Sequence, residues 1–413
     1  MTSTILITIC TLLLVAYVFT LTSAKTRIPS VLLLLILGWA MGQLSTFFGV
    51  ELPDLDPVLS VLATVGLVLI VLEGSLDLKL SRDKIGLVSK SFLGAISSLL
   101  VLSFFTALAF SVYGGYPLRQ SLINAIPLCI ISSAIAIPSV VNLKSSQKEF
   151  VVYESSFSDI AGVILFNFVA LNTSYGIETF GAFGLQVLIL LAVSFVATIG
   201  LSLLLARINH HVKFIPVILL VVLIYTGLKT FHLPGLIFIL LFGLFVGHLD
   251  KLKRISWIRK IVTYSPEKEV ELFKVLTTEG TFLIRSLFFL VFGFLIETRE
   301  LFNPETVLWA LGLVVGFLLI RALQLAISDK PLMPLLFVAP RGLITILLFL
   351  YITPEQSIAL VNRSLIIQII VATVVFMAIG VMLAKSKSQK PKEVNQSQPK
   401  MKLKPTEYGI TQV

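Results

Sequence analysis

Apolar stretches of about 20 residues follow one another along almost the whole chain, and a helix of that length crosses the hydrocarbon core of a bilayer. Helices satisfy their own backbone hydrogen bonds in lipid, so a series of helical spans is the expected solution for this pattern. We therefore predict an all-α polytopic membrane protein with about 13 transmembrane helices. The predicted spans lie near residues 4–23, 28–48, 57–78, 85–113, 119–142, 149–171, 180–206, 213–231, 233–249, 276–297, 305–327, 331–352 and 359–384.

Composition supports a membrane protein and argues against several other classes. Of the 413 residues, 57% are hydrophobic and 13% are charged, whereas charged residues make up about 25% of an ordinary globular domain. Cys10 and Cys129 both fall in apolar stretches, and the four histidines have no metal-ligand spacing. The sequence therefore predicts no disulfide framework, no metal site and no cofactor. It also offers no set of nucleophile, base and orienting group at one depth, as an enzyme would need.

The net charge of +10 comes from Lys and Arg in short loops and in the tail. Alternate loops carry these charges, which is the pattern of cytoplasmic loops rather than of a nucleic-acid-binding surface. We predict a multi-pass protein of the cell membrane, in a bacterium the inner membrane, with its N-terminus outside and its C-terminus in the cytoplasm. The start, MTSTILITIC, lacks the basic residues of a secretory signal and is expected to remain as a span.

Two segments are expected to differ from the spans of the transmembrane domain, which is predicted to occupy residues 1–384. The tail at 385–413 is polar, basic and poor in aromatic residues, and is predicted to be disordered. The loop at 250–278 has apolar residues at helical spacing between basic ones, which predicts an amphipathic cytoplasmic helix at the membrane interface. These apolar residues are Trp257, Ile258, Ile261 and Val262.

Helix-breaking residues interrupt two predicted spans at corresponding places. The fifth span contains Ala136, Ile137 and Pro138, and the twelfth contains Pro340 and Gly342. Proline lacks the backbone donor that a helix interior needs, and paired broken helices near the middle of the membrane mark the binding site of many secondary transporters.

The broken spans are seven spans apart, so they run through the membrane in opposite directions. This is the arrangement of an inverted repeat, in which residues of about 1–171 are repeated in about 213–384.

The stretch YESSFSD, residues 153–159, places carboxylates and hydroxyls at the start of an apolar span. A charged residue at the bilayer centre costs at least about 2.5 to 3.5 kcal/mol, so Asp159 is a functional candidate. Ser155 lies four residues earlier and shares its helical face. Oxygen groups suit a hard cation, and Glu73 of the third span could add another. One carboxylate that holds either a proton or a cation gives exchange; the alternative is that Asp159 is a neutral packing residue.

The other charges within spans are predicted to be structural. A pair between Glu154 and Arg341 would tie the sixth span to the broken twelfth span and avoid two isolated charges in lipid. Arg285 is expected beside Glu279, and Arg321 is expected to extend to the cytoplasmic face.

These motifs, in this order, resemble those of the monovalent cation:proton antiporter superfamily, specifically its sodium/proton exchanger branch. RIPSVLLLLILGWAMG resembles the second helix of that family and LEGSLDL its acidic third helix. YESSFSDIAGVILF resembles its ion-binding helix and APRGL its broken-helix arginine motif. The resemblance covers nearly the whole membrane region. It implies a homodimer, in which each protomer has a dimerisation domain and a core domain that carries two crossed, broken helices and moves as an elevator.

The resemblance also implies roles for individual residues. Asp159 would bind the proton and the cation alternately, and Ser155 and Glu73 would contribute to the ion site. The family's Asn-Asp pair is Ser158-Asp159 here, which assigns Ser158 to the same site. A single acidic residue in this pair implies one proton exchanged per monovalent cation, and hence electroneutral exchange.

A second departure affects the first broken helix. The family's Thr-Asp-Pro appears as Ala136-Ile137-Pro138, so one charge and one side-chain oxygen are replaced by apolar groups.

The sequence as a whole predicts a secondary antiporter that exchanges Na⁺, or alternatively K⁺ or Li⁺, for protons, with membrane lipid around it and no nucleic-acid partner. Two other functions stay open. A cation channel or efflux pore would move ions without a coupled change in pH. A transport-inactive scaffold or sensor is favoured by the altered Thr-Asp-Pro and would bind no ion.

Overall fold

The computed structural model describes residues 2–26, 28–49, 55–78, 84–140, 143–172, 176–207, 214–230, 233, 235–252 and 267–383, and all regular structure in these ranges is helical. Eight of the described helices are long and apolar enough to cross a membrane, and four shorter apolar helices accompany them. The broken helix at residues 332–350 adds one more to these twelve. The prediction of an all-α membrane protein with about 13 spans is therefore confirmed.

Helix α1 is Thr2–Thr26, α2 is Ser30–Phe47, α3 is Asp56–Asp77, α4 is Ile85–Gly114, α5 is Leu118–Cys129, α6 is Ser133–Ser139, α7 is Ser145–Leu171 and α8 is Ile177–Arg207. The chain continues with α9 at Phe214–Thr230, α10 at Gly235–Gly247, α11 at Leu249–Leu252, α13 at Glu267–Phe294, α14 at Thr298–Leu301, α15 at Pro304–Ile327, α16 at Leu332–Leu335, α17 at Leu343–Leu350 and α18 at Arg363–Leu383.

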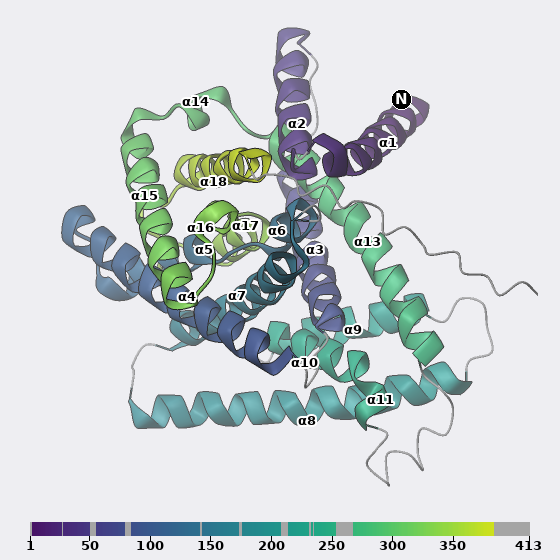
Figure 1. Ribbon diagram of the computed structural model, residues 1–413. Coiled ribbons are helices and arrows are strands. Elements are labelled where there is room, and N and C mark those ends of the chain that lie inside the picture. The colour runs from purple at the N-terminus through teal and green to yellow at the C-terminus, as the bar shows by residue number, and fades with distance from the viewer. Residues whose placement is uncertain are drawn as a thin grey trace, which may run out of the picture.

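The helices pack as two groups with few contacts between them. One group consists of α1, α2, α3, α8, α9, α10 and α13, and the other of α4, α5, α6, α7, α15, α16, α17 and α18. Contacts across the seam are sparse and come mainly from α3 and α10 against α7 and α17. In Figure 1, α7, α16 and α17 lie near the centre, with α4 and α15 on one side and α13 on the other. We refer to the second group, which carries both broken helices, as the core group and to the first as the scaffold group.

The scaffold group is held together by close helix packing at glycines. A Cβ on Gly42 of α2 would lie 2.5 Å from the carbonyl oxygen of Phe294, and a Cβ on Gly293 of α13 would lie 2.5 Å from that of Leu35. Small residues allow helix backbones to approach closely where no hydrophobic effect drives association in lipid. The glycines of GWAMG therefore fix α2 against α13.

The first broken helix separates at Ile130–Ser132, between α5 and α6, and not at Pro138. Ala136, Ile137 and Pro138 lie inside α6, so the predicted position of this break is wrong. A proline lacks the N–H that would bond to the carbonyl four residues earlier, which is the carbonyl of Ala134. The guanidinium of Arg285 donates to that carbonyl at 3.5 Å, and the short helix therefore tolerates its proline.

Tertiary acceptors create the actual break by taking three successive backbone N–H groups. The amide of Ile131 donates to Ser158 Oγ at 2.9 Å, that of Ser132 to the carbonyl of Pro340 at 2.9 Å, and that of Ser133 to Asp159 Oδ2 at 3.1 Å. Backbone groups buried in a membrane protein need such partners where the helix is interrupted. Side chains of α7 and the opposite broken helix thus replace the missing helical bonds.

The second broken helix separates between α16 and α17, and Pro340 and Gly342 lie in this break. The bond from Ser132 to Pro340 joins the two breaks, so the broken helices cross there. A Cβ on Gly342 would overlap the end of the Ile135 side chain, which would have to shift. Glycine therefore gives room where the two broken helices pass one another.

Helix α13 begins at Glu267, so residues 267–278 are helical rather than part of the predicted loop. The buried residues Phe273, Thr277 and Thr281 recur at helical spacing and extend the span toward its start. The predicted amphipathic helix around Trp257 and the predicted disordered tail lie outside the described residues.

Candidate functional site

The carboxylate of Asp159 has one oxygen tied to the protein and one without a partner. Oδ2 accepts the amide of Ser133, whereas Oδ1 is buried and has no hydrogen-bond partner among the described residues. Asp159 is 7% exposed. A buried acceptor normally has a partner, so the free oxygen is available to a ligand.

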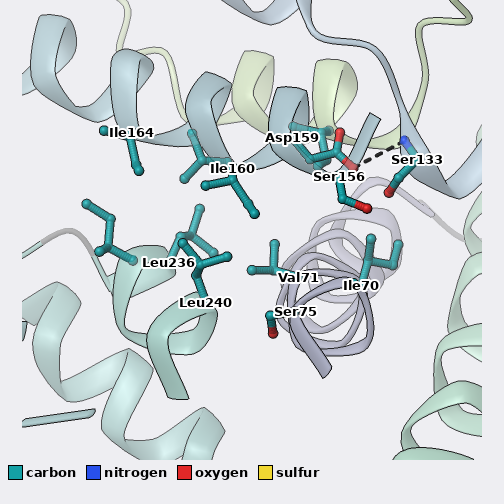
Figure 2. A pocket seen from close by; sticks show the side chains of 14 residues that line it. Ile70, Val71, Ser75, Ser133, Ser156, Asp159, Ile160, Ile164, Leu236 and Leu240 are labelled. Atoms are coloured by element: carbon teal, nitrogen blue, oxygen red, sulfur yellow. Dashed lines mark hydrogen bonds between the residues drawn. The ribbon is translucent and has the colours of Figure 1, made fainter. Parts of the chain in front are cut away.

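Asp159 lines a small cavity at the seam between the two helix groups (Figure 2). The cavity volume of about 20 Å³ exceeds the 10–15 Å³ or so that one buried water needs. Its wall is mostly apolar and comes from α3, α6, α7, α10 and α17. The lining residues are Ile70, Val71, Gly74, Ser75, Ser133, Ser156, Asp159, Ile160, Val163, Ile164, Leu236, Ile237, Leu240 and Ile344.

Ser155 and Ser158, both predicted to contribute to the ion site, do not line this cavity. The Ser155 hydroxyl donates to the carbonyl of Val151 at 2.7 Å within α7, and its side chain is fully buried. The Ser158 hydroxyl accepts the amide of Ile131 at the break. In this conformation Ser155 bonds to its own helix and Ser158 supports the backbone of the broken helix.

Glu154 pairs with Arg321, so the predicted pair with Arg341 is wrong. Arg321 Nη1 donates to Glu154 Oε1 and, at 2.7 Å, to Gln324 Oε1, and Gln324 Nε2 donates to the same oxygen of Glu154. Arg321 is only 3% exposed. It lies six residues before the end of α15 at Ile327, about 9 Å along the helix axis. The prediction that Arg321 extends to the cytoplasmic face is therefore wrong.

Arg321 also stabilises the second break. Its Nε donates to the carbonyl of Leu335 at 3.2 Å and its Nη2 to that of Val338 at 3.4 Å. These carbonyls lie at and beyond the end of α16, where helical partners are missing. One guanidinium thus joins the ion-pair partner on α7 to the second broken helix.

Arg341 is held by other groups. Its backbone amide donates to Thr373 Oγ1 at 3.0 Å, its Nη1 donates to the carbonyl of Ala339 at 3.3 Å, and its guanidinium carbon lies 4.6 Å from the ring centroid of Phe317. An aromatic face is a favourable neighbour for a buried guanidinium. These contacts with Phe317 of α15 and Thr373 of α18 hold Arg341 in place beside the crossing of the broken helices.

Glu73 lies in α3, is half-buried and does not line the cavity. The carboxylate of Glu73 attracts the guanidinium of Arg285 electrostatically. Among the described residues, Arg285 donates a hydrogen bond to the carbonyl of Ala134 and not to the predicted partner Glu279. Arg285 belongs to the scaffold group and Ala134 to the core group, so this contact crosses the seam. Tyr225 of α9 makes a second crossing contact, because its hydroxyl lies 2.8 Å from that of Tyr351 at the end of α17.

Sequence reasoning missed three hydroxyl residues that line the cavity with Asp159, namely Ser75, Ser133 and Ser156. The signal for Ser156 was present, because it precedes Asp159 by three residues and so shares a helical face with it. Ser133 could not be found in this way, since it reaches Asp159 only through the fold.

The arrangement can bind one small cation or a proton at Asp159 Oδ1. Among the described residues no group of three or more His, Cys, Asp or Glu side chains could hold a resident metal ion. Crossed, broken helices around a buried carboxylate near the middle of α7 are the arrangement of a secondary transporter of the inverted-repeat class.

Comparisons with known proteins give the family. The model of the sodium/hydrogen exchanger transmembrane family matches residues 9–388, so the chain belongs to this transporter family. No relative was found among curated protein sequences. The fold matches the sodium proton antiporter MjNhaP1 of Methanocaldococcus jannaschii at pH 8, with a TM-score of 0.61 and 18% identity over 91% of this chain and 94% of that one. An electron-microscopy structure of MjNhaP1 gives a TM-score of 0.63 and 17% identity over 93% and 95%.

Proposed function

We propose that the protein exchanges Na⁺ for protons across the membrane and that Asp159 carries both in turn. The observation that supports this most directly is the buried Oδ1 of Asp159, which has no partner among the described residues and belongs to a side chain that lines a cavity at the seam. A proton and a cation cannot both be bound strongly by one carboxylate oxygen, so each displaces the other. Because this carboxylate is the one acid among the described residues that line the cavity, the proposed exchange is one proton per monovalent cation and electroneutral.

The cation is assigned by the chemistry of the available groups. Carboxylate, hydroxyl and carbonyl oxygens suit hard cations, and among these we propose Na⁺, with Li⁺ and K⁺ as the alternatives that the assay below compares. An exchanger with these substrates would serve sodium and pH homeostasis in the membrane of a bacterial cell.

Movement of the core group against the scaffold group would expose Asp159 to each side in turn. The seam passes through the cavity, and its contacts are sparse compared with those inside either group. The scaffold group would also form the homodimer interface. In this arrangement the N-terminus lies outside and the C-terminus in the cytoplasm, because the basic loops belong on the cytoplasmic side.

The test is the recovery of internal pH in proteoliposomes after a pulse of Na⁺, Li⁺ or K⁺, with the native protein and with Asp159→Asn. The amide is nearly isosteric but cannot release a proton, so we expect coupled exchange to disappear in the variant while folding is kept. With the native protein, the apparent KM for the cation should rise as pH falls, since protons compete for the carboxylate.

Cation uptake and cation binding, measured on the same preparation, separate the remaining alternatives. Cation flux through the native protein without any coupled pH change would indicate a channel. The absence of both flux and cation binding would indicate a scaffold or sensor.

A further inference from the structure

Arg285 is a charged residue inside a span, and its side chain reaches from the scaffold group to the core group. It lies nine residues before the end of α13 at Phe294, about 14 Å along the helix axis. Its Nη1 donates to the carbonyl of Ala134 in α6 at 3.5 Å. Helix α13 itself packs mainly against α2 and α3 of the scaffold group. One side chain therefore links two helices that have little other packing between them.

The acceptor of this contact is open because of Pro138. In a regular α-helix the N–H of residue 138 would bond to the carbonyl of residue 134, but proline has no N–H. Ala134 is 6% exposed, and a buried carbonyl needs a partner. Pro138 thus leaves a carbonyl of the core group free at the seam, and Arg285 supplies the donor from the other side.

The charge of Arg285 has its partner inside the scaffold group. The carboxylate of Glu73 in α3 attracts the guanidinium, and a guanidinium has several donors, so it can stay near a carboxylate and also donate to a carbonyl. An arginine that only balanced Glu73 would not need to reach α6. When the core group moves, Glu73 stays with Arg285, whereas Ala134 moves away from it.

We propose that Arg285 is a positioning residue, which holds the core group in the position that the structure shows and releases it in each transport cycle. The inference rests on the proposed function, because it takes the core group to move against the scaffold group. That movement must break the bond from Arg285 to Ala134, and a charged donor makes one of the stronger hydrogen bonds in a protein. The bond therefore biases the equilibrium between positions, and Pro138 contributes by keeping its acceptor open.

The experiment compares Arg285→Gln with the matched control Arg119→Gln. Arg119 of α5 also donates to backbone carbonyls, those of Asn172 at 3.0 Å and Ala170 at 3.1 Å, but both carbonyls belong to the core group. Its loss should lower stability without changing the position of that group. Since Arg285→Gln leaves Glu73 without its counter-charge, Arg285→Gln combined with Glu73→Gln is measured beside it to keep the charge balanced.

The position of the core group is measured as the distance between two spin labels in the purified full-length protein. The labels are attached to cysteines that replace Leu219 of α9 and Leu308 of α15, which are exposed on the scaffold group and on the core group. Cys10 is exposed and is replaced by Ser, whereas Cys129 is buried and stays. Labelled protein is diluted with unlabelled protein so that only distances within one chain are recorded.

Arg285→Gln should lower the ratio of protein in the position shown here to protein in other positions about tenfold. Arg285→Lys keeps a charged donor and should restore most of that ratio, and Arg119→Gln should leave it within about twofold. In proteoliposomes Arg285→Gln should change the maximal rate of exchange at least about threefold. The apparent KM for Na⁺ should stay within about twofold, since Arg285 does not line the cavity.

Pro138→Ala tests whether the carbonyl of Ala134 is the shared acceptor. The alanine supplies an N–H that competes with Arg285 for this carbonyl, so Pro138→Ala should shift the distances in the same direction as Arg285→Gln. Because both changes act on one acceptor, Arg285→Gln should have a smaller effect on the distances in the Pro138→Ala background than in the native one.

Three outcomes separate this inference from its alternatives. If Arg285→Gln lowers the unfolding temperature but leaves the distances unchanged, Arg285 only stabilises α6 and the inference is overturned. Strictly additive effects of Arg285→Gln and Pro138→Ala would also overturn it, because the two residues would not act on one carbonyl. If the distances shift as expected but the native protein exchanges no protons for any cation, the positioning role stands and the proposed function fails.

Discussion

The two sides of α7 differ in how completely their polar groups are satisfied. On one side, Glu154 and Ser158 are buried and bonded to Arg321 and to the broken helix, and Ser155, which lies between the two sides, bonds to its own helix. On the other side, Ser156 and Asp159 face a cavity, and Asp159 keeps one oxygen without a described partner. The same helix thus uses polar residues for two purposes. Fully partnered groups hold the fold, and incompletely partnered groups are free to bind a substrate.

The largest effect on stability is expected from Arg321→Ala on the partnered side. The substitution leaves the buried carboxylate of Glu154 without its counter-charge, and breaking a buried pair in this way costs about 3–5 kcal/mol. Thermal unfolding of the detergent-purified protein measures the loss.

A double-mutant cycle tests whether Arg321 is the true partner. Glu154→Gln combined with Arg321→Ala should be much less destabilised than the sum of the single changes. The matched cycle of Glu154→Gln with Arg341→Ala should be close to additive. Strong coupling to Arg341 and none to Arg321 would show that the ion pair is assigned to the wrong arginine.

An intermediate effect is expected for Ser158→Ala. The change removes the acceptor of the Ile131 amide at the break, and a buried donor left without a partner costs about 1–3 kcal/mol. The unfolding temperature should fall, and Na⁺ affinity in the folded fraction should be nearly unchanged. A variant of native stability with weakened Na⁺ binding would instead place Ser158 among the ligands.

The smallest effect on stability is expected for Ser156→Ala on the cavity side. Because its hydroxyl bonds to no described residue, its removal should change the free energy of unfolding by less than about 0.5 kcal/mol in the absence of Na⁺. The unfolding temperature in Na⁺-free buffer measures this directly. A large loss of stability would show that the hydroxyl has a structural role and that the contrast between the two sides of α7 is false.

Much of the architecture could be predicted from the sequence because its cause is local. The length of the apolar stretches predicts the spans, and Pro340 together with Gly342 marks the position of the second break. The carboxylate of Asp159 is conspicuous because a charge is costly within an apolar span.

The errors have tertiary causes. Pro138 is tolerated because Arg285, distant in the sequence, bonds to the carbonyl that the proline frees. The first break lies where α7 and Pro340 supply acceptors for three amides, and no local signal marks that place. The choice of Arg321 over Arg341 depends on how α15 packs against α4 and α18, which brings Arg321 to Glu154. Spacing within one helix cannot reveal any of these partners.

The most direct test of the central claim is the number of protons released when Na⁺ binds. Titration calorimetry of NaCl into the purified protein, repeated in buffers of different ionisation enthalpy, gives this number. If Asp159 carries the proton and the cation alternately, close to one proton should be released per Na⁺ at a pH where the carboxyl is protonated, and none from Asp159→Asn. Na⁺ binding without proton release, or unchanged release from Asp159→Asn, would contradict the account.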